Sequence, residues 1–134
     1  MPRLNYLYVE DDRLSQTVMG MLFGDVLGGG SLSIFEDSTD FISRLEALTP
    51  QPDVILMDIH MRPITGIEML TLLRSHPRYH SQRVIALTAS VMSEEVQQLR
   101  EVGFDGCIGK PVDVDTFPEL IDQIEAGHSV WKII

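Results

Sequence analysis

The sequence has one cysteine, Cys107, and no apolar run long enough to cross a membrane. A single cysteine excludes an internal disulfide and a metal site built from several thiolates. Basic residues are also scarce, with ten Lys and Arg against twenty Asp and Glu. The net charge of −10 disfavours direct binding to nucleic acid or to an anionic membrane surface. The first residues lack the long apolar segment of a signal peptide, so we expect a cytoplasmic protein.

The length and composition predict one folded domain. A chain of 134 residues fits a single core, and 44% hydrophobic residues are enough to exclude intrinsic disorder. We therefore expect one domain over residues 1–134. Little sequence follows the last predicted helix, so we expect no second, DNA-binding or catalytic domain within these residues, whether the chain is a stand-alone protein or a segment of a longer one.

Short apolar runs alternate with segments of helical periodicity along the whole chain. The runs predict five strands, at residues 4–9, 32–35, 54–57, 84–87 and 106–109. Several runs are almost continuously apolar, as is typical of parallel strands covered on both faces. The alternation predicts a doubly wound (βα)5 α/β fold, in which ligands bind beyond the carboxyl ends of the strands.

Apolar spacing and capping residues predict the helices between these strands. In the first helix the predicted buried face consists of Leu14, Val18, Met21 and Leu22, and the glycines at 28–30 end the helix. Thr65 and Glu68 form a predicted capping box at the start of the third helix. Gly103 is predicted to end the fourth helix.

Polar residues follow four of the predicted strands. They are Glu10, Asp11 and Asp12 after the first, Asp58 after the third, Thr88 after the fourth and Lys110 after the fifth. Because carboxyl ends of parallel strands share one edge, we expect these groups to converge. Crowded carboxylates would repel one another by several kcal/mol, at an effective dielectric constant of about 20, unless a cation lay between them. Mg²⁺ fits such a site and leaves coordination positions for phosphoryl oxygens, which the lysine and the hydroxyl could also contact.

Five short motifs carry a resemblance to a known family. They are VEDD at 9–12, DVILMDIHM at 53–61, Gly66, ALTA at 86–89 and GKP at 109–111. With these motifs in this order, the chain resembles the receiver domain of bacterial two-component response regulators, including the single-domain chemotaxis type. The resemblance implies a flavodoxin-like three-layer sandwich whose five-stranded parallel sheet has the order 2-1-3-4-5.

The resemblance also implies a function and its partners. A receiver accepts a phosphoryl group from the phosphohistidine of a histidine kinase or of a histidine phosphotransfer protein. Its affinity then changes for a downstream protein target or for a second copy, here through the face at residues 93–126. Such a protein catalyses only its own phosphotransfer and dephosphorylation, so we expect a signalling phosphoacceptor and not an enzyme.

Six residues match functional positions of the family. Asp58 matches the phosphoacceptor, Asp11 the direct Mg²⁺ ligand, Glu10 the acid that reaches the ion through water, and the backbone carbonyl of His60 a further ligand. Thr88 matches the hydroxyl that contacts the phosphoryl group, and Lys110 matches the lysine that pairs with it. The implied chemistry is nucleophilic attack by a carboxylate, with the metal and the lysine offsetting charge on the transferring group.

Three residues leave alternatives open. Asp12 either joins the site or caps the first helix, and its position favours the cap. The His60 side chain either tunes the rate of dephosphorylation or faces solvent. Cys107 stands where the family usually has a tyrosine or phenylalanine whose rotation reports phosphorylation, so either the thiol fills core space or the switch works differently.

Other functions account less well for these residues. An aspartyl-nucleophile phosphatase needs a second acid two positions after the nucleophile, where this sequence has His60. A flavodoxin-like FMN carrier needs hydroxyl and amide groups in its first loop, and the acids at 10–12 would repel the phosphate. A receiver-like adaptor that is never phosphorylated is a further alternative, although no acceptor, metal acid, hydroxyl or lysine is missing.

Overall fold

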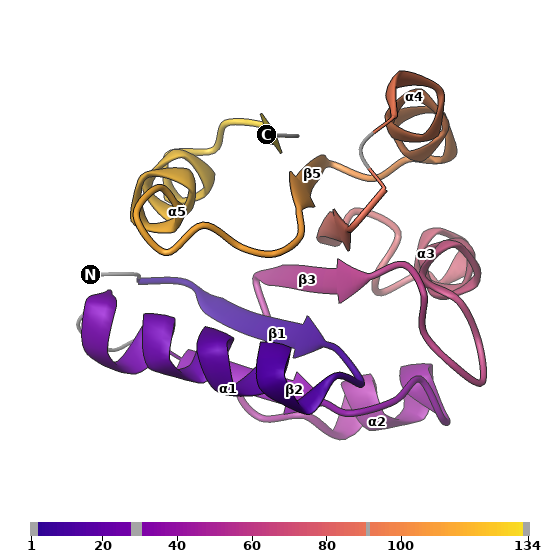
Figure 1. The fold of residues 1–134 in the computed structure, drawn as a ribbon. Helices are drawn as coiled ribbons and strands as arrows, with labels where there is room; N and C mark the ends of the chain where they lie inside the picture. Colours follow the sequence, from indigo (N-terminus) through magenta and orange to yellow (C-terminus); the bar gives the residue numbers. More distant parts are fainter. Residues whose placement is uncertain (1–2, 28–30, 91, 133–134) are drawn as a thin grey trace.

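A parallel sheet of six strands runs through the molecule, with helices on both faces (Figure 1). The computed structural model describes residues 3–27, 31–90 and 92–132. The strands are β1 (Asn5–Val9), β2 (Ser31–Phe35), β3 (Val54–Asp58), β4 (Arg83–Thr88), β5 (Gly106–Gly109) and β6 (Trp131–Lys132). The helices are α1 (Arg13–Met21), continued by the π-helical turn η1 (Leu22–Val26), α2 (Phe41–Ala47), α3 (Gly66–Ser75), α4 (Ser93–Val102) and α5 (Phe117–Glu125).

The order of the first five strands is the predicted one. The sheet runs β2-β1-β3-β4-β5-β6, and every neighbouring pair is parallel. All five residues of the central strand β3 are buried, which explains why its sequence is a continuous apolar run up to Asp58. The sequence did not predict β6, which pairs with the outer edge of β5.

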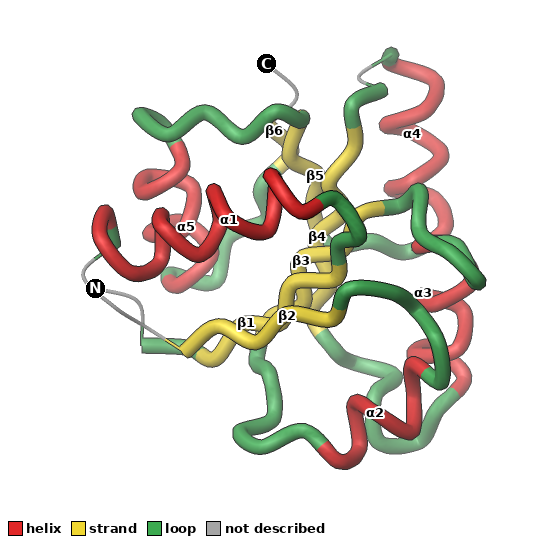
Figure 2. The backbone as a smooth tube through the Cα atoms, turned by 60° about the horizontal axis from the view of Figure 1, so that its bottom comes forward, coloured by secondary structure: helices red, strands yellow, loops and turns green. Residues whose placement is uncertain are grey.

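Helices cover both faces of the sheet (Figure 2). An apolar core lies between the sheet and each of the two helical layers. Residues of α2, α3 and α4 pack on one face of the sheet against Leu7, Ile55 and Cys107. Residues of α1 and α5 pack on the other face against Tyr6 and Tyr8. Alternate side chains of one strand therefore enter different cores, as the period of two in a strand requires.

The predicted buried face of α1 is partly wrong. Leu14 is 71% exposed and Met21 is 57% exposed, whereas Met19 and Phe23 are buried. Only Leu22 of the predicted set is fully buried. Several overlapping faces satisfy the same helical spacing, and the bulky Phe23, which stacks against Tyr6 and Phe117, determines which one turns inward. The glycines predicted to end this helix lie outside the described residues.

The other predicted helix boundaries are confirmed. The Thr65 side chain accepts from the Glu68 N–H at 3.2 Å, and the Glu68 carboxylate accepts from the Thr65 N–H at 2.8 Å, so the capping box is complete. Gly103 ends α4 with a φ of 110°, a left-handed conformation that favours glycine. At the start of α3, a Cβ on Gly66 would lie 2.6 Å from the backbone Cα of Ile59. This close approach holds α3 against the residue that follows Asp58.

We predict that Gly66→Ala destabilises the protein by about 1–3 kcal/mol, because the added methyl would push α3 away from backbone that cannot yield. The matched control is Gly20→Ala in α1, where no atom lies within 4 Å of the added Cβ. That control should stabilise the helix by roughly 0.5–1 kcal/mol. Urea unfolding monitored by circular dichroism measures both changes, and equal midpoints for the two variants would contradict the packing described.

Candidate functional site

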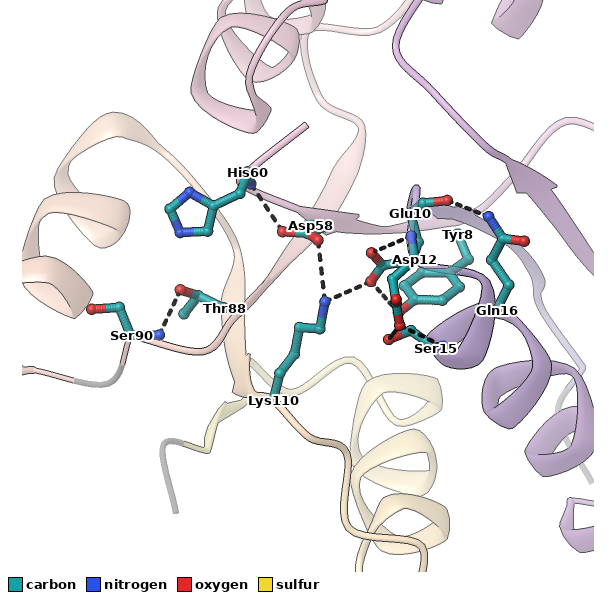
Figure 3. Close-up of polar contacts among 10 residues, drawn as sticks. All are labelled: Tyr8, Glu10, Asp12, Ser15, Gln16, Asp58, His60, Thr88, Ser90 and Lys110. Carbon is teal, nitrogen blue, oxygen red and sulfur yellow. Dashed lines mark hydrogen bonds and ion pairs between the residues drawn. The ribbon is translucent and has the colours of Figure 1, made fainter. Parts of the chain in front are cut away.

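The polar groups predicted to converge lie together at the carboxyl edge of the sheet (Figure 3). Glu10 directly follows β1, Asp58 ends β3, Thr88 ends β4 and Lys110 directly follows β5. The ammonium nitrogen of Lys110 lies 2.7 Å from Glu10 Oε1 and 3.1 Å from Asp58 Oδ2. One lysine therefore bridges carboxylates that are 48 residues apart in the sequence.

Hydrogen bonds fix both oxygens of the Asp58 carboxylate. Oδ1 accepts from the backbone N–H of His60 at 2.9 Å, and Oδ2 accepts from Lys110. Asp58 is only 6% exposed, so little of its side chain meets solvent. The carboxylate is thus held in one orientation with little conformational freedom to lose when it reacts.

Glu10 is fully buried and is held from several sides. Its Oε1 accepts from the Tyr8 hydroxyl at 2.8 Å as well as from Lys110, and its Oε2 accepts from the Asp12 N–H at 3.1 Å. Burial raises the pKa of Glu10, and the bonds from Lys110 and Tyr8 oppose that shift. Tyr8 was not predicted as a site residue, although a residue two positions before Glu10 lies on the same side of the strand.

Lys110 stays charged in this site. Its burial lowers the pKa, but the hydrogen bond to Glu10 and the charge of Asp58 outweigh burial, so the pKa of Lys110 is raised above its ordinary value. A single ammonium nevertheless faces the carboxylates of Glu10, Asp58 and the neighbouring Asp11. The site therefore keeps an excess of negative charge that a second cation could balance.

Three carboxylates are arranged so that they could hold that cation. Glu10, Asp11 and Asp58 each offer one oxygen, and these oxygens all lie within 4.8 Å of one another. An all-oxygen set of this kind suits Mg²⁺, which binds a few carboxylates and keeps water ligands. Asp11 is exposed, so an ion could enter from the solvent side. The role of the His60 carbonyl as a further ligand stays a prediction.

A backbone hydrogen bond joins Thr88 and Lys110. The Lys110 N–H donates to the Thr88 carbonyl at 2.8 Å. The buried Thr88 hydroxyl oxygen accepts from the Ser90 N–H at 3.0 Å, which leaves the hydroxyl hydrogen to be donated elsewhere. The His60 side chain is exposed beside the site, and neither of its two possible roles is tested by this position (Figure 3).

The geometry resolves the alternatives for Asp12 and shows where Cys107 lies, while the switching mechanism stays open. Asp12 is the N-cap of α1, since its Oδ2 accepts from the Ser15 N–H at 2.9 Å and from the Ser15 hydroxyl at 2.7 Å. These bonds lower the pKa of Asp12. Cys107 is fully buried in the core that faces α4, and burial raises the pKa of its thiol to about 11. The thiol is therefore a protonated core group at neutral pH.

The comparison with known families agrees with this fold. The model of the response regulator receiver domain matches residues 6–122. The chain belongs to that family of signalling phosphoacceptors. None of the helices among the described residues is long and apolar enough to cross a membrane.

Individual relatives are similar over most of the chain. The polar-differentiation response regulator DivK of Brucella anthropi is 29% identical over 121 residues, which are 90% of this chain and 94% of DivK. The chemotaxis response regulator CheY4 of Vibrio cholerae superposes with a TM-score of 0.77 at 22% identity, covering 90% of this chain and 98% of CheY4. A response regulator from Chloroflexus aurantiacus gives a TM-score of 0.79 at 18% identity, with 94% of this chain and 99% of that chain covered. The two structures confirm the fold.

We predict that Mg²⁺ stabilises the folded protein, because the ion binds the clustered carboxylates only when they are assembled. The gain should be about 2.7 kcal/mol at a free Mg²⁺ concentration of about 100 times Kd, measured as a rise in melting temperature. Asp11→Asn should melt higher than wild type without metal, since a repelling charge is removed, and should lose the Mg²⁺ shift.

The matched control is Asp12→Asn, which removes the adjacent charge, keeps a residue that caps helices well and leaves the three clustered carboxylates in place. Its Mg²⁺ shift should match that of wild type. An undiminished shift in Asp11→Asn would show that the ion binds elsewhere.

Proposed function

We propose that this receiver domain accepts a phosphoryl group from a phosphohistidine onto Asp58, with Mg²⁺ bound, and that its affinity for a partner protein then changes. The observation that carries the proposal is the position of the Asp58 carboxylate. It is ordered at the end of the central strand, lies 3.1 Å from a charged lysine and shares a cluster with two other acids. We further propose that residues 1–134 act as one receiver domain in the cytoplasm, and the free thiol of Cys107 is compatible with a reducing compartment.

The proposed transfer is a displacement at phosphorus. An oxygen of Asp58 attacks the phosphorus, and a P–O bond forms as the P–N bond to the donor histidine breaks. The electron pair of the broken bond leaves with the imidazole nitrogen. A bound Mg²⁺ would offset negative charge on the phosphoryl oxygens. Lys110 supplies positive charge from the other side, and the free hydrogen of the Thr88 hydroxyl is available to a phosphoryl oxygen.

The Lys110 contacts also support a response to phosphorylation. A phosphoryl group on Asp58 adds negative charge directly beside the lysine, which in this structure divides its bonds between Asp58 and Glu10. We propose that Lys110 moves toward the phosphoryl group and that Thr88 follows. Because Thr88 precedes α4 and Lys110 follows β5, both movements would reach the face at residues 93–126.

Exposed apolar side chains beside the acceptor support a protein as the phosphodonor. A cavity of about 240 Å³ lies next to Lys110, and Leu14, Val18, Val112 and Val114 are among the residues that line it. Leu14 is 71% exposed and Val114 is 47% exposed. A histidine kinase or a histidine phosphotransfer protein could bury these side chains while presenting its phosphohistidine. The net charge of −10 supports a protein partner over a nucleic acid.

We predict that acetyl phosphate with Mg²⁺ adds the mass of one phosphate to the wild-type chain and nothing to Asp58→Asn, because the amide cannot act as the nucleophile. The matched control is Asp53→Asn, an exposed residue before the same strand, which should be labelled like wild type. Intact-mass spectrometry measures all three proteins. Equal labelling of Asp58→Asn would place the acceptor elsewhere, and an unlabelled wild type would favour the unphosphorylated adaptor.

A further inference from the structure

The outer edge of β5 is covered by a later segment of the same chain (Figure 2). We call residues 128–132 the strap. The Val130 carbonyl accepts from the Cys107 N–H at 2.7 Å, and β6 continues the pairing with Trp131 opposite Cys107 and Lys132 opposite Ile108. The strap therefore occupies the strand edge that lies between α4 and α5, within the face proposed above for partner contact.

Trp131 supplies an aromatic ring beside Cys107. The ring packs against the core that contains Leu99 and Cys107, and the guanidinium carbon of Arg100 lies 4.3 Å from the ring centroid. Trp131 thus contacts both α4 and the neighbourhood of β5. In this chain the aromatic group next to the fifth strand comes from the strap instead of from residue 107.

The first and last residues of the strap contact different parts of the protein. Arg83 donates to the His128 carbonyl at 2.8 Å, and the Val130 side chain is buried in the core under α5. Beyond Val130, the described contacts are a two-residue ladder, the packing of the half-buried Trp131 ring against the core, and the stack with Arg100. A cavity of about 230 Å³ between the strap and α5 is lined by Leu120, Val130 and Trp131, among others. The Trp131 end can therefore turn away from β5 and take the Val130 carbonyl with it, while the His128 contact and the buried Val130 side chain stay in place.

The two elements that hold Trp131 both lead back to the acceptor site. The strand β5 runs directly into Lys110, and α4 follows the loop after Thr88. The Lys110 N–H donates a hydrogen bond to the Thr88 carbonyl, so a displacement of either residue also displaces the other. A change in the distance between α4 and β5 therefore alters the space between them that the Trp131 ring occupies.

We propose that the strap is an autoinhibitory contact that closes the β5 edge in the unphosphorylated protein, and that phosphorylation of Asp58 releases Trp131 from this edge. The proposal rests on the proposed function, because it assumes that Asp58 accepts the phosphoryl group. Release leaves the strand edge open to an extended segment of a protein partner, which would add a strand where β6 lies. The strap thereby decides when that edge is available.

Trp131 is the single tryptophan of the sequence, so its fluorescence reports on the strap alone. The test compares acrylamide quenching of the full chain with and without Mg²⁺ and beryllofluoride, a stable substitute for the phosphoryl group. We expect the quenching constant to rise severalfold on addition of beryllofluoride, and hydrogen exchange at the Cys107 amide to accelerate. Asp58→Ala should show neither change. Fluorine NMR of the same samples establishes whether beryllofluoride is bound.

A glycine opposite the strap provides a variant that releases it without phosphorylation. A Cβ on Gly106 would lie 2.5 Å from the Val130 carbonyl oxygen, so Gly106→Ala should push the strap off. This variant should show high quenching without ligand and no further rise with beryllofluoride, whereas Gly20→Ala should behave as wild type. If Gly106→Ala does not fold, Arg100→Gln removes the stacked guanidinium from an exposed position and should raise quenching without ligand.

Two results would overturn the proposal, and they differ in whether the proposed function survives. If beryllofluoride binds while Trp131 quenching and Cys107 exchange stay unchanged, the strap is a permanent sixth strand and the proposed function stands. If beryllofluoride does not bind to wild type, the proposed function fails and the release mechanism fails with it.

Discussion

The ion pairs between Lys110 and the carboxylates of Glu10 and Asp58 are the interactions on which the rest of the site depends. Glu10 has no exposure to water and Asp58 has very little, so the lysine and the hydrogen bond donors around them offset the cost of burying two carboxylates. One ammonium cannot balance both of them together with Asp11. This imbalance would favour a divalent ion in the site, and it would make the position of Lys110 sensitive to any further charge on Asp58.

The fold around these charged groups explains how they can lie close together. Parallel strands bring four chain segments to one edge, and the Tyr8 hydroxyl and the Asp12 N–H supply Glu10 with donors that the lysine alone could not. The close contact of Gly66 with Ile59 keeps α3 against the end of β3. Stability and function are therefore coupled at this edge, because the same backbone that orders the core also positions the carboxylates.

Features encoded by local patterns could be predicted from the sequence, and features that depend on close packing could not. Five strands, their order and the convergence of Glu10, Asp58, Thr88 and Lys110 follow from apolar runs and from a resemblance carried by those residues. The buried face of α1 was predicted in part wrongly, because helical spacing alone does not distinguish Leu14 from Met19. The strand β6 escaped prediction because two residues are too short for a periodic signal, and its pairing depends on the missing side chain of Gly106.

We propose that charge added at Asp58 redirects Lys110 and thereby the elements attached to it. The most direct test is a crystal structure with Mg²⁺ and beryllofluoride. We expect beryllofluoride on Asp58, the metal among the three carboxylates, and the Lys110 ammonium within hydrogen bond distance of fluorine, with its 2.7 Å contact to Glu10 lost. Beryllofluoride on Asp58 with the Lys110–Glu10 contact intact would contradict it.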